Sequence, residues 1–357
     1  MATKPGLMQP RRPCAAAGWR SSRSGAAGSR WPDSSPGIRG CCRRPMPPVG
    51  PRLAPRQLLL SFHWTDAGLW AALESKERCA TWQVRQAAGL PKEVEALARS
   101  MCLFDPVAPV ATERLQEGDW PGSAARIERM LFENSRITLA EGIDELVIVP
   151  DGWLWYVPFE LLPVATNRAG AGGDGERRLR DVCRIRYCPT RSMAVMRFDP
   201  RPVGPIGVVA GRLFRGDRPA VADEAVADMT AAIDGVVPIA SPPGSSPVLA
   251  ASVCDTLLVL DEISAEGSRA GRPLVAGGAG RGGITFAEWL GLPPKRPQRV
   301  LLPGLQSAMA RGLAKPPERP GADMFLAATD LLAAGSHTAV ISRWRVGGKS
   351  CLDLMTE

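Results

Sequence analysis

The chain has 357 residues, 45% of them apolar, which suffices to bury one large core or two modest ones. No apolar run reaches the roughly 18 residues that a transmembrane helix needs, so no membrane span is expected. The net charge of +8 is concentrated in residues 1–56, where eleven Lys and Arg accompany one acid, Asp33, leaving 33 basic and 35 acidic residues elsewhere. The remainder of the chain is close to neutral, which argues against nucleic acid as a partner.

Residues 1–55 are rich in Arg, Pro, Gly and Ser and have no hydrophobic periodicity, which predicts a disordered basic tail. A solvated tail, an over-extended reading frame and a basic arm for nucleic acid or acidic lipid remain open as interpretations. The tail lacks the apolar core of a secretory signal, so a cytoplasmic location is expected. The nine cysteines show no paired metal spacing and there are only two histidines, so reduced thiols and no metal or other cofactor are expected.

Residues 56–142 are predicted to form an N-terminal region of strands and helices. Three short apolar segments predict an antiparallel meander, and two periodic segments predict helices, with Gly142 as the C-cap of the second. The expected strands are 57–63, 69–75 and 79–86, and the expected helices are 92–104 and 123–142.

Residues 143–357 alternate apolar strands with helical segments, the pattern of a parallel sheet covered on both faces. The fold class is therefore predicted to be α/β, a mostly parallel sheet flanked by helices with a small antiparallel front meander. Two Gly- and Arg-rich stretches, 166–178 and 264–283, read as loop insertions. The expected strands are 145–150, 183–189, 205–211, 256–262, 299–304 and 337–345, and the expected helices lie near 220–234, 285–291, 307–314 and 324–335.

The stretch "DELVIVPDGWLWYVPFELLPVA", residues 144–165, predicts a strand, a Pro-Asp-Gly turn, a second strand over 153–157 and a helix starting at Phe159. Its aromatic residues indicate a chiefly architectural role. This string resembles the CHAT domain, a caspase-like domain. "FLAATDLLAAGSHTAVISRWRVGGKSCLDLM", residues 325–355, resembles the closing helix, strand and loop of that family. The resemblance covers about residues 56–357 and implies a caspase-like fold.

The resemblance also implies where a peptidase dyad would stand. The family's HxxxHG string aligns with "LLVLDEI", which places Leu258 and Glu262 at the histidine positions, and its LSACxTA string aligns with "LPGLQSA", which places Leu305 at the cysteine. Leucine is no nucleophile, and a carboxylate raises the pKa of a neighbouring thiol. Cys254, His63 and His337 lie in places that do not suit a replacement dyad. The expectation is a catalytically inactive peptidase homologue; an active cysteine peptidase or other hydrolase with a remodelled site is the alternative.

Polar residues near the expected dyad position predict a possible pocket for a peptide or protein partner, formed by Asp261, Gln306, Ser307, Arg343 and Arg345. Solvated strand ends or local ion pairs are the other interpretation of these residues. "VGGKS", residues 346–350, lacks the first glycine of a phosphate loop, where Arg343 stands, so no nucleotide site is expected. The sequence stops at Glu357 within a predicted helix, so a C-terminally truncated domain is one expectation.

Overall fold

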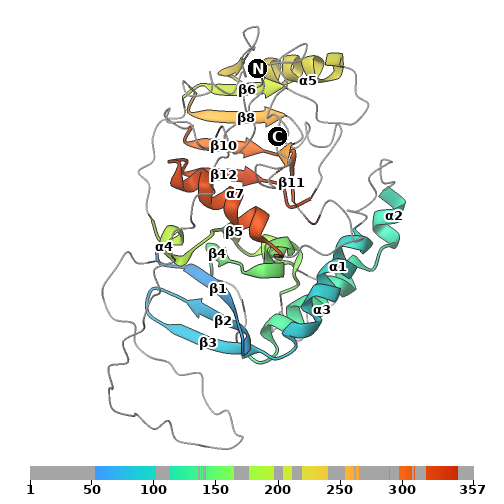
Figure 1. Ribbon diagram of the computed structural model, residues 1–357, viewed down its shortest axis with the longest axis vertical. Helices are drawn as coiled ribbons and strands as arrows, with labels where there is room; N and C mark the ends of the chain where they lie inside the picture. Colours follow the sequence, from blue (N-terminus) through green and yellow to red (C-terminus); the bar gives the residue numbers. More distant parts are fainter. Residues whose placement is uncertain are drawn as a thin grey trace, which may run out of the picture. The chain divides into compact units, whose positions relative to one another are not determined.

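A computed structural model describes the chain within residues 53–344 (Figure 1). The described residues are 53–101, 112–135, 137, 139, 142–164, 177–196, 204–210, 219–239, 254–260, 263–264, 289, 297–307, 309 and 319–344. The predictions made for residues 1–52, most of the two Gly- and Arg-rich stretches and the last thirteen residues lie outside this part.

The predicted front meander is present as part of a five-stranded mixed sheet with the order β3-β2-β1-β4-β5. β2 pairs antiparallel with β1 and β3, whereas β1, β4 and β5 run parallel. In β1 the side chains of Leu60 and Phe62 enter the large core, because alternate residues of a strand face the same side. The strands are β1 (Gln57–Thr65), β2 (Gly68–Glu74), β3 (Cys79–Val84), β4 (Glu145–Val149) and β5 (Arg184–Tyr187).

The helices of the N-terminal region are shorter than the sequence pattern predicts. The helix predicted over 123–142 corresponds to α3, which ends at Phe132, so Gly142 is not its cap. The Gly142 carbonyl instead accepts a hydrogen bond from Arg56 Nε at 3.0 Å. A proline in the first turn of α1 and of α3 favours the helix start, because a first-turn amide needs no intrahelical acceptor. The elements are η1 (Ala87–Gly89), α1 (Leu90–Ser100), α2 (Thr112–Glu117) and α3 (Trp120–Phe132).

The aromatic motif after β4 forms two 3₁₀ helices, η2 (Gly152–Tyr156) and η3 (Phe159–Leu161), so the second strand predicted over 153–157 is wrong. Four consecutive side chains, residues 154–157, are buried. They are buried because the motif lies within the large cluster to which both sheets contribute; β4, a strand buried on both faces, has consecutive buried side chains as well. Gly152 opens the turn at φ +56°, and a Cβ there would lie 2.9 Å from Trp64 Nε1.

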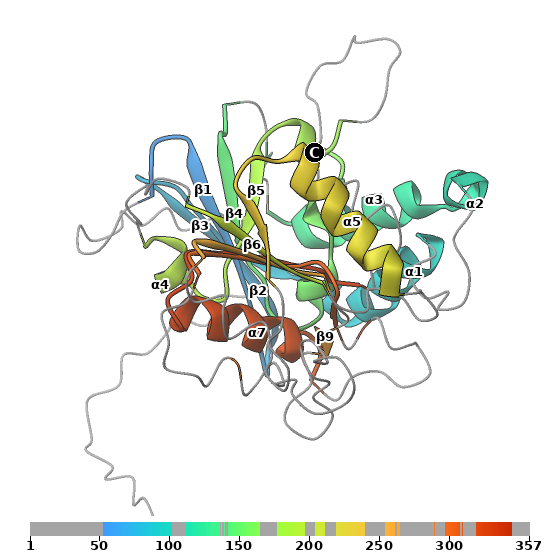
Figure 2. The same cartoon turned by 90° about the horizontal axis from the view of Figure 1, so that it is seen from above.

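The second sheet has five parallel strands in the order β12-β10-β8-β6-β7. Helices α5 (Pro219–Ala232) and α7 (Ala322–Ala333) cover its opposite faces, as Figure 2 shows. β7 was not predicted, because three residues give too short a pattern. The strands are β6 (Ile206–Ala210), β7 (Val236–Pro238), β8 (Thr256–Leu260), β10 (Arg299–Leu302) and β12 (Thr338–Ile341). Two-residue strands β9 (Ile263–Ser264) and β11 (Leu305–Gln306) pair beyond β8 and β10.

The predicted α/β class is correct, but the parallel strands are divided between two sheets. The expected strands at 145–150 and 183–189 join the meander, and the later four form the separate parallel sheet. One large buried cluster contains Leu60 and Leu146 from the first sheet, Leu257 and Val300 from the second, and Phe159 from the motif. The two sheets therefore share a core. In the described part of the chain, no helix is long and apolar enough to cross a membrane.

Candidate functional site

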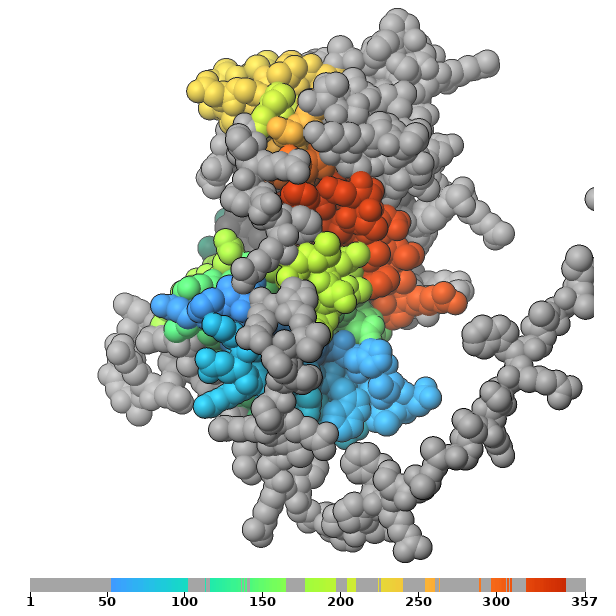
Figure 3. Space-filling model, turned by 90° about the vertical axis from the view of Figure 1, so that its left-hand side faces the viewer, coloured from blue at the N-terminus to red at the C-terminus, as the bar shows by residue number. Residues whose placement is uncertain are grey.

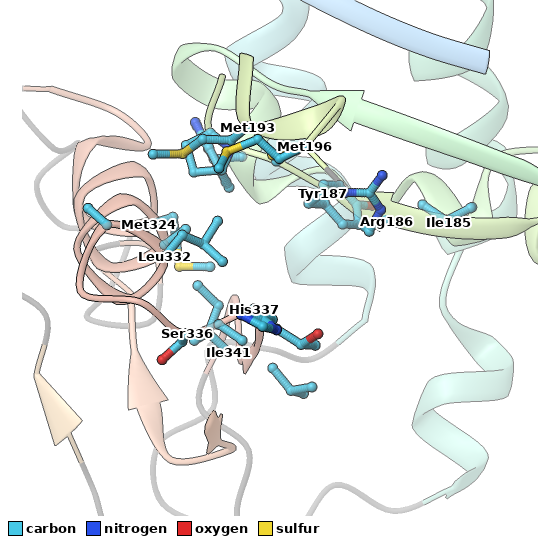
Figure 4. A pocket seen from close by; sticks show the side chains of 18 of the residues that line it. Ile185, Arg186, Tyr187, Met193, Met196, Met324, Leu332, Ser336, His337 and Ile341 are labelled. Carbon is cyan, nitrogen blue, oxygen red and sulfur yellow. The ribbon is translucent and has the colours of Figure 1, made fainter. Parts of the chain in front are cut away.

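A cavity of about 670 Å³ lies where an edge of the first sheet approaches an edge of the second (Figure 4). β5 and the short helix α4 (Arg191–Ala194), with the turn after it, bound the cavity from the first sheet; β12 and α7 bound it from the second. The 177–196 and 319–344 segments also lie side by side at the surface (Figure 3). The cavity therefore lies between an edge strand of each sheet, β5 and β12, together with the helices beside them.

The cavity is mostly apolar. Met196 and Val340 line it with 53% and 44% of their surface exposed, which is a large exposure for side chains of this kind. Methionine side chains are flexible and polarizable, so they adapt to apolar ligands of different shapes. Such a surface suits an apolar ligand better than a charged one. The central apolar lining residues are Met193, Met196, Met324, Leu332, Val340 and Ile341.

Arg343, which follows β12, connects this strand with the aromatic motif. Its Nε donates a hydrogen bond to the Trp155 carbonyl at 3.1 Å, and its Nη1 lies 3.6 Å from Glu160 Oε2. Its guanidinium carbon stands 4.0 Å from the centre of the Tyr187 ring, a cation–π arrangement. The charge of Arg343 is therefore balanced within the protein and does not call for an anionic ligand.

Tyr187 fixes the same corner from β5. Its hydroxyl donates to Glu160 Oε2 at 2.9 Å and accepts from the Phe159 amide at 3.1 Å. Burial strongly raises the pKa of Tyr187, while the Arg343 charge opposes that shift. The phenol therefore remains a neutral hydrogen-bond donor at physiological pH.

Of the positions to which the family resemblance assigns the dyad, Leu258 lies in β8 and Leu305 in β11. Leu305 is fully buried in β11, and its partner across the ladder is Ile263, the residue after Glu262. Glu262 and Asp261 themselves lie outside the described residues. A buried leucine side chain at this place offers neither a nucleophile nor a proton acceptor.

The residues of the predicted polar pocket are only partly described. Ser307 is buried and its hydroxyl donates to the main-chain carbonyl of Arg343, which brings these two residues together. The Arg343 side chain, however, points toward Trp155 and Glu160. Gln306 pairs with Ser264 through β11, but its side chain and all of Arg345 lie outside the described residues.

The described cysteines do not have the character of nucleophiles. Burial, the largest cause in each case, raises the thiol pKa of Cys79, Cys183, Cys188 and Cys254 above its ordinary value. Cys188 lines the cavity together with His337. Its pKa is raised although Arg186 opposes the shift, so it is a protonated thiol at neutral pH.

The cavity itself was missed by sequence reasoning. Its apolar lining comes from two stretches, β5 with the α4 region and α7 with β12, which are more than 120 residues apart in the chain. The two methionines of "RSMAVM", residues 191–196, and the uncharged strand "TAVI", residues 338–341, were the available signals. Neither pattern alone distinguishes a lining residue from an ordinary core residue.

These features define an α/β protein with two sheets, a shared core and an apolar cavity between the sheet edges. In the part of the chain with described coordinates, no group of three or more His, Cys, Asp or Glu could hold a metal ion. No protein-family model matches the chain, and no curated protein matches it.

Proposed function

We propose that this chain is a caspase-like CHAT-domain homologue without the Cys/His dyad, which works as a binding module for a peptide or protein segment. The observation that carries the proposal is the cavity between β5 and β12, where Met196 and Val340 remain exposed although the surrounding side chains pack into a core. Exposed apolar surface inside a recess is typical of a ligand site.

The absence of peptidase chemistry is supported by two observations, one at the position that the resemblance assigns to the nucleophile and one at the cavity. The resemblance assigns the nucleophile to Leu305, whose buried side chain has no reactive group. Cys188 does line the cavity with His337, which favours a remodelled peptidase as the second candidate function. Against that candidate, the raised pKa of Cys188 keeps the reactive thiolate scarce at neutral pH.

The binding role can be tested with the neutral, environment-sensitive dye Nile red. We expect Val340→Glu to weaken dye binding about tenfold or more, because a buried carboxylate next to bound apolar surface is costly. Leu326→Glu is the matched control, since Leu326 is 53% exposed on α7 but does not line the cavity. Equal binding by the two variants would refute the assignment of the cavity as the binding site.

The catalytic alternative can be tested with an electrophilic thiol probe. Because burial raises the thiol pKa values, native labelling at pH 7 should be slower than labelling of the unfolded chain, and should accelerate as the pH rises above the ordinary cysteine value of 9.0. Fast labelling at pH 7 that Cys188→Ser abolishes and Cys183→Ser leaves intact would contradict the non-catalytic proposal.

A further inference from the structure

β12 is an edge strand of the parallel sheet, and no strand of the described part of the chain pairs with its outer side. Its four residues, Thr338–Ile341, contain neither a charged residue nor a proline. The opposite edge, β7, has three residues and ends in Pro238, which cannot donate a ladder hydrogen bond. Proteins commonly block free edges with charge, proline or short strands, because an open edge pairs with any available strand. Of the two edges, only β12 lacks such protection.

The main chain of β12 offers hydrogen-bonding groups toward the cavity. The Thr338 amide donates to Gln298 on the side of β10, and the parallel register pairs Thr338 with Arg299. Because successive residues of a strand direct their main-chain groups to opposite sides, those of Ala339 and Ile341 point away from β10. Both residues line the cavity, and within the described residues no strand pairs with this side of β12.

The dimensions of the recess limit what can pair there. The wall opposite β12 consists of β5 and the α4 region, so a segment that pairs with β12 must fit between two parts of the same chain. Four residues of strand span about 13 Å, which sets the length of a paired segment. A second folded copy would have to bring its own sheet edge and covering helices into the recess. An isolated extended segment needs no such space.

The charges around the cavity select an uncharged segment. Arg343 is paired with Glu160, and Arg186 lies 3.4 Å from Glu145 and donates to the Ala194 carbonyl. Glu145 also pairs with Arg184 at 3.0 Å, so it is shared by two arginines. Among the described lining residues, each charged side chain is held by an internal contact and none is free to bind an acidic or basic peptide. The methionines of the wall instead favour apolar side chains at the positions that face them.

We infer that β12 binds one extended, uncharged segment of a partner protein, which adds as a sixth strand to the parallel sheet and places apolar side chains in the cavity. The inference rests on the proposed binding function and specifies its mode. Main-chain hydrogen bonds to Ala339 and Ile341 provide affinity that depends little on sequence, and the apolar walls provide the side-chain preference.

The test uses the full chain and a nine-residue fluorescent peptide that alternates valine with threonine, followed by fluorescence anisotropy. In a second peptide the main-chain nitrogens of all valines are methylated, and in a third those of all threonines. Each of these two peptides therefore lacks the amide donors along one of its two edges. One of these two should bind about tenfold more weakly or worse than the other, because several ladder hydrogen bonds are lost together. Ala339→Pro removes an amide donor on the cavity side and leaves the Thr338 amide bond to Gln298 available, so it should weaken binding of the parent peptide similarly.

Several results would overturn the inference. Equal affinity of all three peptides would show side-chain binding without strand addition, and would leave the proposed binding function intact. Peptide binding that appears only after Leu352→Asp and Leu354→Asp would identify the chain's own C-terminal segment as the occupant. A concentration-dependent dimer that Ala339→Pro disperses would identify a second copy. If the folded wild-type chain binds neither Nile red nor the peptide, the proposed function is refuted as well.

Discussion

At the scale of the residue, Tyr156 shows how one side chain links distant segments. Its hydroxyl donates to Asp323 Oδ1 at 2.8 Å and accepts from the Gly321 amide at 2.9 Å. These contacts join the 3₁₀ turn of the aromatic motif to the start of α7. The sequence indicated that Tyr156 is a packing residue, but the two partners of its hydroxyl lie 165 and 167 residues away and could not be predicted.

Gly321 is required where α7 begins. It has φ +75°, and a Cβ would lie 2.2 Å from the Gly152 carbonyl oxygen. Gly235 has φ +80° but nothing within 4 Å of the same position. Gly235→Ala should therefore cost about 1–2 kcal/mol from backbone strain alone. Gly321→Ala should cost about 1–3 kcal/mol more, because the surrounding structure must shift.

Urea unfolding of the two glycine variants measures this difference directly. Because both substitutions add the same methyl group at similar φ angles, the difference in unfolding free energy isolates the steric contact with the aromatic motif. Equal losses of stability would mean that Gly321 does not approach Gly152 as closely as described.

At the scale of the element, an ion pair between a half-exposed arginine and a buried carboxylate holds the short helix α4 against the first sheet. Arg191, the first residue of α4, contacts both carboxylate oxygens of Glu74 in β2, and its Nη2 lies 2.7 Å from Oε2. The Glu74 side chain is 9% exposed. A four-residue helix has little stability of its own, so this contact and the packing of Ala194 keep it in place.

Glu74→Gln should lower the free energy of unfolding by about 1.5–3 kcal/mol, because a charged hydrogen-bond acceptor in a buried place is replaced by a neutral one. Asp144→Asn serves as the control, since Asp144 is 65% exposed and pairs with the equally accessible Arg56 at 2.9 Å. The control should cost less than about 1 kcal/mol. Denaturant titrations that give the same loss for both variants would contradict the described burial of Glu74.

At the scale of the whole molecule, the shared core predicts that the two sheets unfold together. Phe159 is fully buried and lies 5.7 Å, between ring centroids, from Phe62 of the first sheet. The same cluster includes Leu302 of the second sheet. Phe159→Ala should cost about 3–5 kcal/mol, as large-to-small substitutions in a core do.

For wild type, and separately for Phe159→Ala, the unfolding transition followed by far-ultraviolet circular dichroism should coincide with the transition followed by tryptophan fluorescence. Trp70→Ala is a suitable control, because Trp70 is exposed on β2 and its loss should move the transition much less. Separate transitions for the two probes would show that the sheets are energetically independent, contrary to the shared core.

The candidate site was less predictable than the fold class. Strand and helix patterns depend on neighbouring residues, so the sequence located β1, β4, β8 and α7 to within a few residues. The cavity depends on which strands end the two sheets, and that follows from pairings between remote segments. The aromatic motif was assigned correctly as buried but wrongly as a strand, because alternating bulky residues fit either a strand or a tight helical turn.

The sequence by itself determined the α/β class, the antiparallel meander and the near-neutral charge of residues 57–357, since composition and local periodicity suffice for these. Only the tertiary structure decided that β5 and β12 border a cavity and that Arg343 binds back to Trp155 and Glu160. The physical reason is that local free-energy preferences select elements, whereas the free edges of sheets and the partners of buried polar groups are selected by packing across the whole chain.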